Sequence, residues 1–328
     1  MTERVLSLRE LNRATLARQL LLRRERLPVT RAVERIAGLQ AQWAPALPTG
    51  LWTRLDGFDP GELERAYARK AIVRATLMRA TIHLVSTRDY LHFHPALAET
   101  IRRKYRRPGE DAAELERRAE RAMAAAAERT PGSELRQLVG ADGWYGVLRY
   151  ARFVRVGNDY VAADRWLPQP YEPREQGVRH LVRRYLAAWG PATAADVATW
   201  AGLQVADFRD ALEEVGTRRF RDERGRLLYD LPRAPLPPAD TPAPPRLLPR
   251  FDNTILSHAD RTRVISDEHR KIVIRAGEVD PVVLVDGFVV GRWRRKGRRI
   301  VVEWFADVAR TARGELEDEA RRLEAFLG

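Results

Sequence analysis

Two glutamines, Gln40 and Gln42, stand near the end of the stretch RIAGLQAQWAPAL, which runs from Arg35 to Leu47. A primary amide has two donors and two acceptor lone pairs, but it is neither a general acid nor a general base. It can orient a water molecule. Proton transfer by a side chain contributes roughly 10²–10⁴ to a rate, and a site built from amides forgoes it. Such a site fits a substrate whose leaving group is already activated. The alternative is structural: the amides cap a helix end and bond to nearby backbone.

The position of the pair depends on where a helix ends. The apolar spacing predicts a helix from about Thr30 to Gln42. Positions two apart on a continuous helix point in opposite directions. The amides therefore converge only if the helix breaks between or just after them. Pro45 restricts Ala44 away from the helical region, so we expect both amides to face one point near a helix end, beside the first hairpin.

Polar residues alternate in MRATIHLVS, which places Arg79, Thr81 and His83 on one face of a predicted strand. All three can contact DNA phosphates. His83 could also approach a bound substrate or the water, and its alternative is a structural role among apolar neighbours. Arg74 and Arg79 flank the predicted hairpin. In a DNA-binding protein they would contact the DNA backbone as part of a wing. The alternative is that they belong to a solvated face.

Two further basic segments are candidates for phosphate contact. In SHADRTR the expected contact is Arg261, while His258 and Asp260 lack a third ligand at metal-binding spacing, so no metal site is expected. The densest basic run, RWRRKGRR, is either a solvated turn or a DNA contact and contributes Arg292, Arg294 and Arg295. No lysine is close to the glutamines in sequence, so a Schiff-base step is not indicated.

The composition limits the class of protein. The 328 residues carry a net charge of +13 and a pI of about 10.6. This excess favours nucleic acid as a partner, although arginine-rich chains also arise from GC-rich codons. Cysteine is absent, which excludes disulfides and thiol catalysis. The N-terminus lacks a signal core, and no apolar run could cross a bilayer. We expect a cytoplasmic, nucleoid-associated protein without metal or cofactor.

One order of elements, three helices followed by a hairpin, recurs three times. This is the order of a winged helix-turn-helix. The predicted boundaries are 1–108, 109–170 and 171–232 for the three units, 233–249 for a Pro-rich connector, and 250–328 for a β-rich C-terminal domain. We therefore predict an α+β fold: three tandem winged helix-turn-helix units with a C-terminal β-meander and closing helix. Asp286-Gly287 and Lys296-Gly297 are the expected turns of the meander.

Winged helices usually bind duplex DNA, which leaves three interpretations. The chain is an enzyme acting on DNA, a non-enzymatic regulator, or a basic scaffold for protein partners. A regulator usually dimerises to read a palindrome. Three units in one chain, without a dimerisation coil, favour a monomer.

Four stretches, in order, carry a resemblance to a known family: GLQAQ, LMRATIHLVSTRDY, FDNTILSHADR and VLVDGFVVGRWR. Over essentially its full length the chain resembles the winged-helix DNA-binding proteins that include the AlkZ-type and YcaQ-type DNA glycosylases. The resemblance implies three tandem winged helices in a C-shape around a basic channel. It also implies removal of bulky N7-alkylated purines, including interstrand cross-links, from duplex DNA.

The family motif is Gln-x-Gln or Gln-x-Asp. Gln40 and Gln42 match the first form, so the resemblance implies that they are the catalytic pair of a monofunctional glycosylase. The chain lacks the carboxylate of the second form, and the substrate range of that branch does not carry over.

Overall fold

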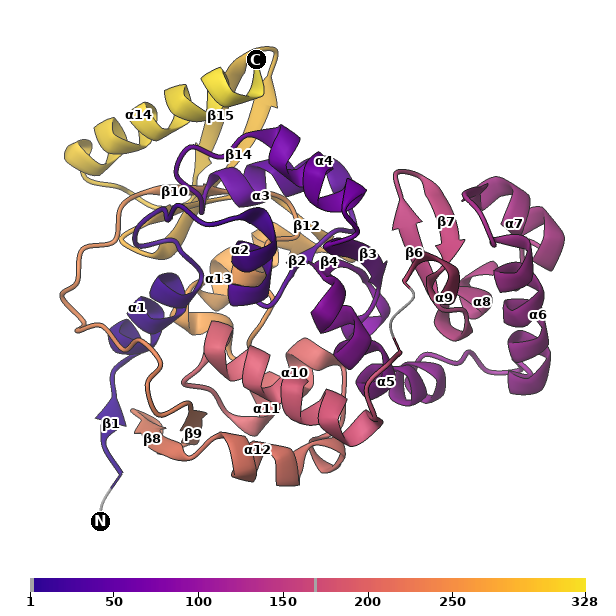
Figure 1. The fold of residues 1–328 in the computed structure, drawn as a ribbon. Helices are drawn as coiled ribbons and strands as arrows, with labels where there is room; N and C mark the ends of the chain where they lie inside the picture. Colours follow the sequence, from indigo (N-terminus) through magenta and orange to yellow (C-terminus); the bar gives the residue numbers. More distant parts are fainter. Residues whose placement is uncertain (1–2, 168–169) are drawn as a thin grey trace.

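A computed structural model describes residues 3–167 and 170–328 and has a mixed α+β fold (Figure 1). The first and third segments of the chain form its centre, the middle segment lies at one side, and the C-terminal sheet with the last helix lies at the opposite end. The three predicted hairpins are present, each after helices. The sequence did not predict the helix over Thr87–Lys104 or the strand over Leu39–Gln40. No helix among the described residues is long and apolar enough to cross a membrane.

The elements of the first segment are β1 (Val5–Leu6), α1 (Leu8–Arg18), α2 (Val29–Arg35), β2 (Leu39–Gln40), α3 (Leu47–Trp52), α4 (Pro60–Ala68), β3 (Ile72–Thr76), β4 (Ile82–Ser86) and α5 (Thr87–Lys104). A capping box of Ser7 and Glu10 opens α1. The predicted hairpin is confirmed, and its turn residues Arg79 and Ala80 are both left-handed, with φ of 56° and 57°.

The prediction that the second helix continues to Gln42 was wrong. Helix α2 ends at Arg35, and the chain turns through Ala37 and Gly38, whose φ values are 58° and 85°. A Cβ on Gly38 would lie 2.8 Å from the carbonyl oxygen of Leu84, so only glycine lets the chain enter the sheet there. Gln40 therefore lies on a strand rather than on a helix.

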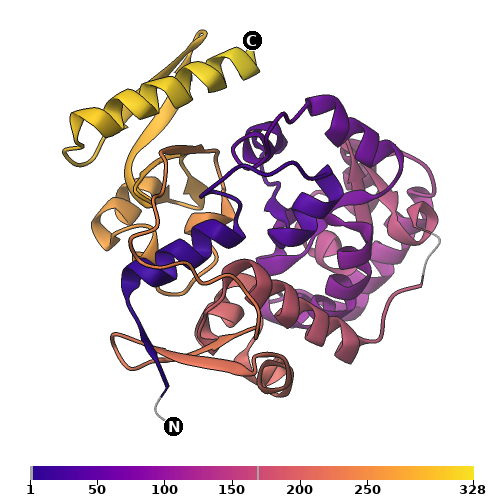
Figure 2. The same cartoon turned by 60° about the vertical axis from the view of Figure 1, so that its left-hand side comes forward.

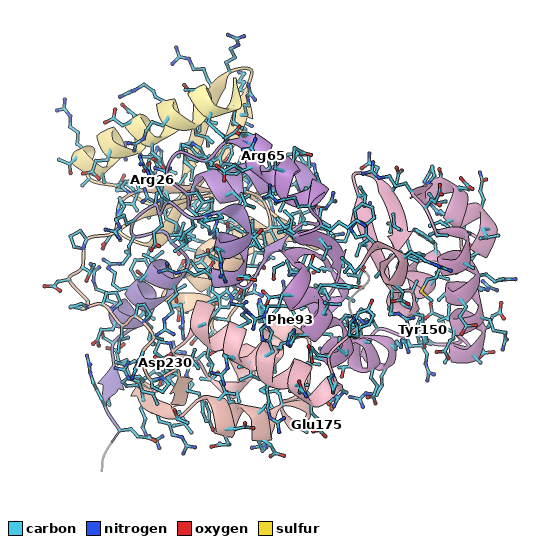
Figure 3. All side chains as sticks on the ribbon, viewed as in Figure 1. Arg26, Arg65, Phe93, Tyr150, Glu175 and Asp230 are labelled. Atoms are coloured by element: carbon cyan, nitrogen blue, oxygen red, sulfur yellow. The ribbon has the colours of Figure 1, made fainter. Side chains whose placement is uncertain are left out.

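The middle segment contains α6 (Ala112–Ala125), β5 (Thr130–Pro131), α7 (Gly132–Val139), α8 (Trp144–Tyr150), β6 (Phe153–Val156), β7 (Asp159–Ala162) and α9 (Ala163–Trp166). The third segment contains α10 (Arg174–Trp189), α11 (Ala194–Ala201), α12 (Arg209–Val215), β8 (Arg218–Asp222) and β9 (Leu227–Asp230). Both hairpins lie where the sequence predicts them. Helices α5 and α10 pack together across the central core, where Phe93 lies between them (Figure 3).

Two sheets join segments that are distant in sequence. The first and middle hairpins form one six-stranded sheet in the order β2-β4-β3-β6-β7-β5. Within it Gln40 pairs with His83 and His83 pairs with Ala75, so these three share a face, while Arg74 pairs with Leu84 and lies on the other face. The N-terminal strand β1 runs parallel to β8, so it belongs to the sheet of the third segment.

The C-terminal part contains β10 (Arg246–Leu248), α13 (Asp267–Val273), β11 (Ile274–Arg275), β12 (Glu278–Val279), β13 (Val282–Val285), β14 (Phe288–Lys296), β15 (Arg299–Trp304) and α14 (Arg310–Leu327). The meander and its predicted turn at Asp286-Gly287 are confirmed. The second turn lies one residue later than predicted, at Gly297 and Arg298, because Lys296 still belongs to β14 and pairs with Arg299. Helix α14 docks on the sheet through Leu323, which is fully buried with Trp293.

The Pro-rich connector lies along α1 (Figure 2). Three arginines of that helix donate to its carbonyl oxygens: Arg9 to Ala239, Arg13 to Thr241 and Arg18 to Pro235. The connector then ends in β10, an edge strand of the C-terminal sheet, which agrees with the expectation that it holds no helix or central strand. Arg18 also forms a buried pair with Asp230 of β9 (Figure 3).

A second buried ion pair joins the first segment to the C-terminal part. Arg54 donates to both carboxylate oxygens of Asp252 at 2.8 Å, and both side chains are fully buried. Burial pushes the pKa of Asp252 upward, but Arg54 and Thr254 together hold it below its ordinary value. This pair fixes the short 3₁₀ turn Asn253–Ile255 that follows Asp252.

Because an unpaired buried charge is costly, Arg54→Met should lower the free energy of unfolding by about 3–5 kcal/mol. The double variant Arg54→Met with Asp252→Leu should recover part of that loss. Arg26→Met breaks an exposed pair with Asp56 and should cost about 0–1 kcal/mol. Denaturant unfolding measures all three, and equal losses for Arg54→Met and Arg26→Met would contradict the role given to the buried pair.

Candidate active site

The guanidinium of Arg79 joins three parts of the chain. It donates to the carbonyl oxygen of Trp200 at 2.6 Å and to Oε1 of Gln40 at 2.8 Å. It also approaches Oδ1 of Asn253 at 3.4 Å and Nε2 of His83 at 3.5 Å. The first hairpin, the carboxyl end of α11 and the turn after Asp252 therefore meet at this one side chain.

The backbone of Arg79 fits this place closely. Gly202 caps α11 in the left-handed region, and a Cβ there would lie 3.0 Å from both N and Cα of Arg79. The guanidinium thus lies at the negative end of a helix, where a cation is stabilised. Lys104 donates to the carbonyl oxygen of Gly202 at the same helix end.

Arg79 also fixes the orientation of the Gln40 amide. Arginine can only donate hydrogen bonds, so the atom of Gln40 that faces it must be the carbonyl oxygen. Gln40 is 9% exposed and lies on β2. Its oxygen is held by Arg79, while its NH₂ group points elsewhere and remains a donor.

Gln42 lies just after β2 and is exposed. Its Oε1 accepts from the backbone N–H of Ile82 at 3.3 Å, which extends the pairing of β2 with β4 by a side-chain bond. This contact with the backbone is the kind expected if Gln42 has a structural role. The bond is long and at the surface, so the amide of Gln42 can exchange it for another partner at little cost.

His83 is fully buried, and burial together with Arg79 lowers its pKa to about 3. Its Nδ1 lies 3.1 Å from the carbonyl oxygen of Thr81. The ring is therefore neutral, with its proton on Nδ1 and the lone pair of Nε2 toward Arg79. A buried neutral ring is neither a general acid at neutral pH nor open to a phosphate in this structure.

Arg79 remains a cation without a paired carboxylate. Burial, with the neighbouring Arg261, lowers its pKa to about 10, so it is protonated at neutral pH. Within the described part of the chain, no carboxylate oxygen lies within 4.0 Å of its guanidinium. Arg261 is the phosphate contact expected from SHADRTR, and its charge is one of the causes that lower the pKa of Arg79.

The other predicted residues lie in different surroundings. The hydroxyl of Thr81 donates to the carbonyl oxygen of Met78 within the hairpin turn. Arg74 lies on the opposite face of the sheet from Gln40 and donates to the carbonyl oxygen of Gly157.

Of the basic run on β14, only part remains unpaired at the surface. Arg292 pairs with Asp280 and Glu303, each at 2.9 Å. Arg295 donates to the carbonyl oxygens of Leu327 and Gly328 and so caps α14. Arg294 is exposed.

Sequence reasoning missed two parts of the site. Asn253 and the carbonyl oxygen of Trp200 both contact Arg79 from positions more than a hundred residues away. Asp252 caps the turn that carries Asn253, and this Asx signal within FDNT was the one local indication. No group of three or more metal-ligating carboxylate or histidine side chains is found in the ranges that the structure describes.

Residues 33–326 match the family model "DNA glycosylase AlkZ-like". The chain therefore belongs to the AlkZ-like DNA glycosylase family, and the resemblance found in the sequence is confirmed.

Two comparisons with proteins of Streptomyces sahachiroi, one of sequence and one of structure, illustrate the relationship. An interstrand DNA cross-link repair glycosylase is 30% identical over 219 residues, which cover 60% of this chain and 55% of that protein. The match therefore spans only just over half of that relative. The structure of DNA glycosylase AlkZ superposes with a TM-score of 0.81 at 22% identity, covering 96% of this chain and 95% of that one. This second comparison establishes a shared fold.

The low pKa of His83 makes a testable contribution to stability. Its pKa is about 3 when folded and about 6.5 when unfolded, so the unfolded state takes up the proton first as pH falls. Stability is therefore full above about pH 6.5 and decreases below it. Between pH 7 and 5 one such histidine contributes a loss of about 2 kcal/mol.

His83→Gln should remove that part of the pH dependence, because glutamine does not titrate. Denaturant unfolding of both proteins at pH 7 and pH 5 measures it. His92→Gln serves as the control, because Nδ1 of His92 contacts the carbonyl oxygen of Arg88 at the surface. An unchanged pH dependence in His83→Gln would mean that the ring is protonated or accessible in the folded protein.

Proposed function

We propose that the protein is a monofunctional DNA glycosylase that hydrolyses the N-glycosidic bond of N7-alkylated purines in duplex DNA. The observation that carries the proposal is the Gln40 amide held by Arg79 beside the exposed amide of Gln42. Membership of the AlkZ-like family supports it. We propose interstrand cross-links as a further substrate class, because the relative that matches over part of its length is an interstrand DNA cross-link repair glycosylase.

The chemistry of the site suits this substrate. His83 is neutral and Arg79 is protonated, so neither is poised to transfer a proton at neutral pH. An N7-alkylated purine carries a positive charge on its ring, and its C1′–N9 bond is correspondingly weak. When that bond breaks, the electron pair neutralises the departing base, which needs no acid. Water adds to C1′ and loses its proton to solvent.

The two amides then have different tasks. Gln42, exposed and weakly bonded, orients the water against C1′. The oxygen of Gln40 is fixed by Arg79, so its NH₂ group and the second lone pair of its oxygen are held at a set position for the same water. Each pairs with water through ordinary hydrogen bonds, which order the attack without activating the nucleophile.

DNA contact is assigned to the cations around the site. Arg79 and Arg261 lie near each other, and a backbone phosphate beside the lesion would relieve their mutual repulsion. Arg74, Thr81 and Arg294 remain proposed backbone contacts, whereas Arg292 and Arg295 are engaged with protein groups and would have to exchange them. His83 is reassigned from DNA contact to positioning of Arg79.

The wider interpretation is that the three helix–hairpin segments are tandem winged helices with the predicted boundaries, working as a cytoplasmic, nucleoid-associated monomer. The three-helix and hairpin order of the third segment, α10 to β9, supports it most clearly. The rival is a non-enzymatic winged-helix DNA-binding protein, in which the glutamines only close the edge of the sheet.

Substitutions at the two glutamines distinguish the glycosylase from the non-enzymatic DNA-binding protein. On duplex DNA containing 7-methylguanine, Gln40→Ala and Gln42→Ala should each slow base release about tenfold or more, about 1.4 kcal/mol of barrier per tenfold. DNA affinity should hardly change. Because both amides act on one water, the double variant should cost less than the product of the singles. Gln42→Asp should retain activity, since a carboxylate also accepts from water.

Gln137→Ala removes an exposed glutamine on α7 and should match the wild type. Free base is measured by chromatography and DNA affinity by gel shift. Wild-type protein that is folded and bound to this DNA, yet releases no base above background, would overturn the activity on this lesion and favour the rival.

A further inference from the structure

A second basic site lies on the face of the six-stranded sheet opposite Gln40. A cavity of about 760 Å³ opens between α4 and the turn that joins β6 to β7. Tyr67, Arg74 and Arg155 are among the residues that line it, and Trp166 forms part of its wall. Figure 1 shows the β6–β7 hairpin beside β3, where the middle segment meets the rest of the protein.

Two arginines face each other across this junction. Arg74 of β3 is directly opposite Arg155 of β6, in a strand pairing of only two residue pairs. Like charges directly opposite one another destabilise a sheet. Neither guanidinium has a carboxylate oxygen within 4.0 Å among residues 3–167 and 170–328. Glu64 and Asp159 line the cavity but lie beyond that range.

The buried donors of the site also lack acceptors. Nε of Arg74, Nε of Arg155 and the hydroxyl of Tyr67 are buried without a hydrogen-bond partner among the residues that the structure describes. Arg74 is 8% exposed and donates only to the carbonyl oxygen of Gly157, at 3.2 Å. Arg155 stacks on the ring of Tyr160 at 4.9 Å. Buried donors are almost always satisfied in native proteins, so this set implies a missing acceptor.

The protonation states fit an anionic acceptor. Burial lowers the pKa of Arg74, and Arg155 lowers it further, although Arg74 remains charged at neutral pH. Burial raises the pKa of Tyr67 well above its ordinary value, so its hydroxyl keeps its proton. The site therefore presents two cations and one neutral hydroxyl, all of them donors.

We propose that this cavity binds a phosphate group, held by Arg74 and Arg155 with the hydroxyl of Tyr67. A phosphate has only acceptor oxygens and a negative charge, so it complements both the unpaired donors and the repulsion between the arginines. The group is either a backbone phosphate of DNA or a free phosphate. Since β3 and β6 share so short a pairing, the bound group also fastens the middle segment to the first. The site does not depend on base release.

Thermal unfolding of the full chain tests binding of free phosphate. Inorganic phosphate, compared with chloride at equal ionic strength, should raise the Tm of the wild type. Arg155→Gln and Tyr67→Phe should abolish most of the rise. Tyr67→Phe removes only a hydroxyl that has no partner, so its fold should survive even if Arg155→Gln unfolds. Arg121→Gln, which alters an exposed arginine of α6, should keep the wild-type response.

Gel-shift titrations in phosphate-free buffer test the DNA source. If a backbone phosphate occupies the site, Arg155→Gln should make the slope of log affinity against log salt shallower by about one relative to Arg121→Gln. A phosphate response without this change assigns the site to free phosphate, and the converse assigns it to DNA. Absence of both effects, or a Tm rise that Arg155→Gln and Tyr67→Phe retain in full, would overturn the proposal.

Discussion

The contact of the Arg79 guanidinium with Gln40 is the interaction on which the site depends. Arg79 also donates to the carbonyl oxygen of Trp200 in the last turn of α11 and approaches Asn253, so one side chain relates three segments that are distant in sequence. Because it can only donate, it decides which end of the Gln40 amide faces inward. A lysine could not replace it, because its compact ammonium lacks the planar set of donors with which the guanidinium contacts several partners at once.

The surroundings of Arg79 support that role with rigid parts. His83 gives it a neutral neighbour rather than a competing charge. The buried pair of Arg54 with Asp252 holds the turn that carries Asn253. Gly202 lets the hairpin turn approach α11 closely. In the proposed reaction no protein group transfers a proton, so the rate must come from positioning, and the proposal therefore requires this rigidity.

The sequence predicted the elements better than the site. Turn residues located the hairpins, because these signals are local. The alternation in MRATIHLVS predicted Arg79 and Thr81 on the same strand as His83, and this was wrong: both lie in the hairpin turn, and only His83 is on β4. The side chain of Arg79 nevertheless reaches back to within 3.5 Å of His83. The helix through Gln42 was wrong because the decisive contact, Gly38 against the Leu84 carbonyl, is made across the sheet. Asn253, Trp200 and the pairing of Arg74 with Arg155 also arise only from tertiary structure. The glutamines were proposed from their spacing and the family resemblance, whereas the contact of Arg79 with Gln40 required the fold.

The most direct measurement of the central claim is a double-mutant cycle between Gln40 and Arg79 on single-turnover base release with enzyme in excess. If Arg79 acts by holding the Gln40 amide, adding Arg79→Met to Gln40→Ala should slow release little further. Adding Arg261→Met, which changes a cation without a contact to either amide, should instead slow both backgrounds by the same factor. Independent, multiplying effects of Gln40→Ala and Arg79→Met would contradict the claim that the two side chains work as one unit.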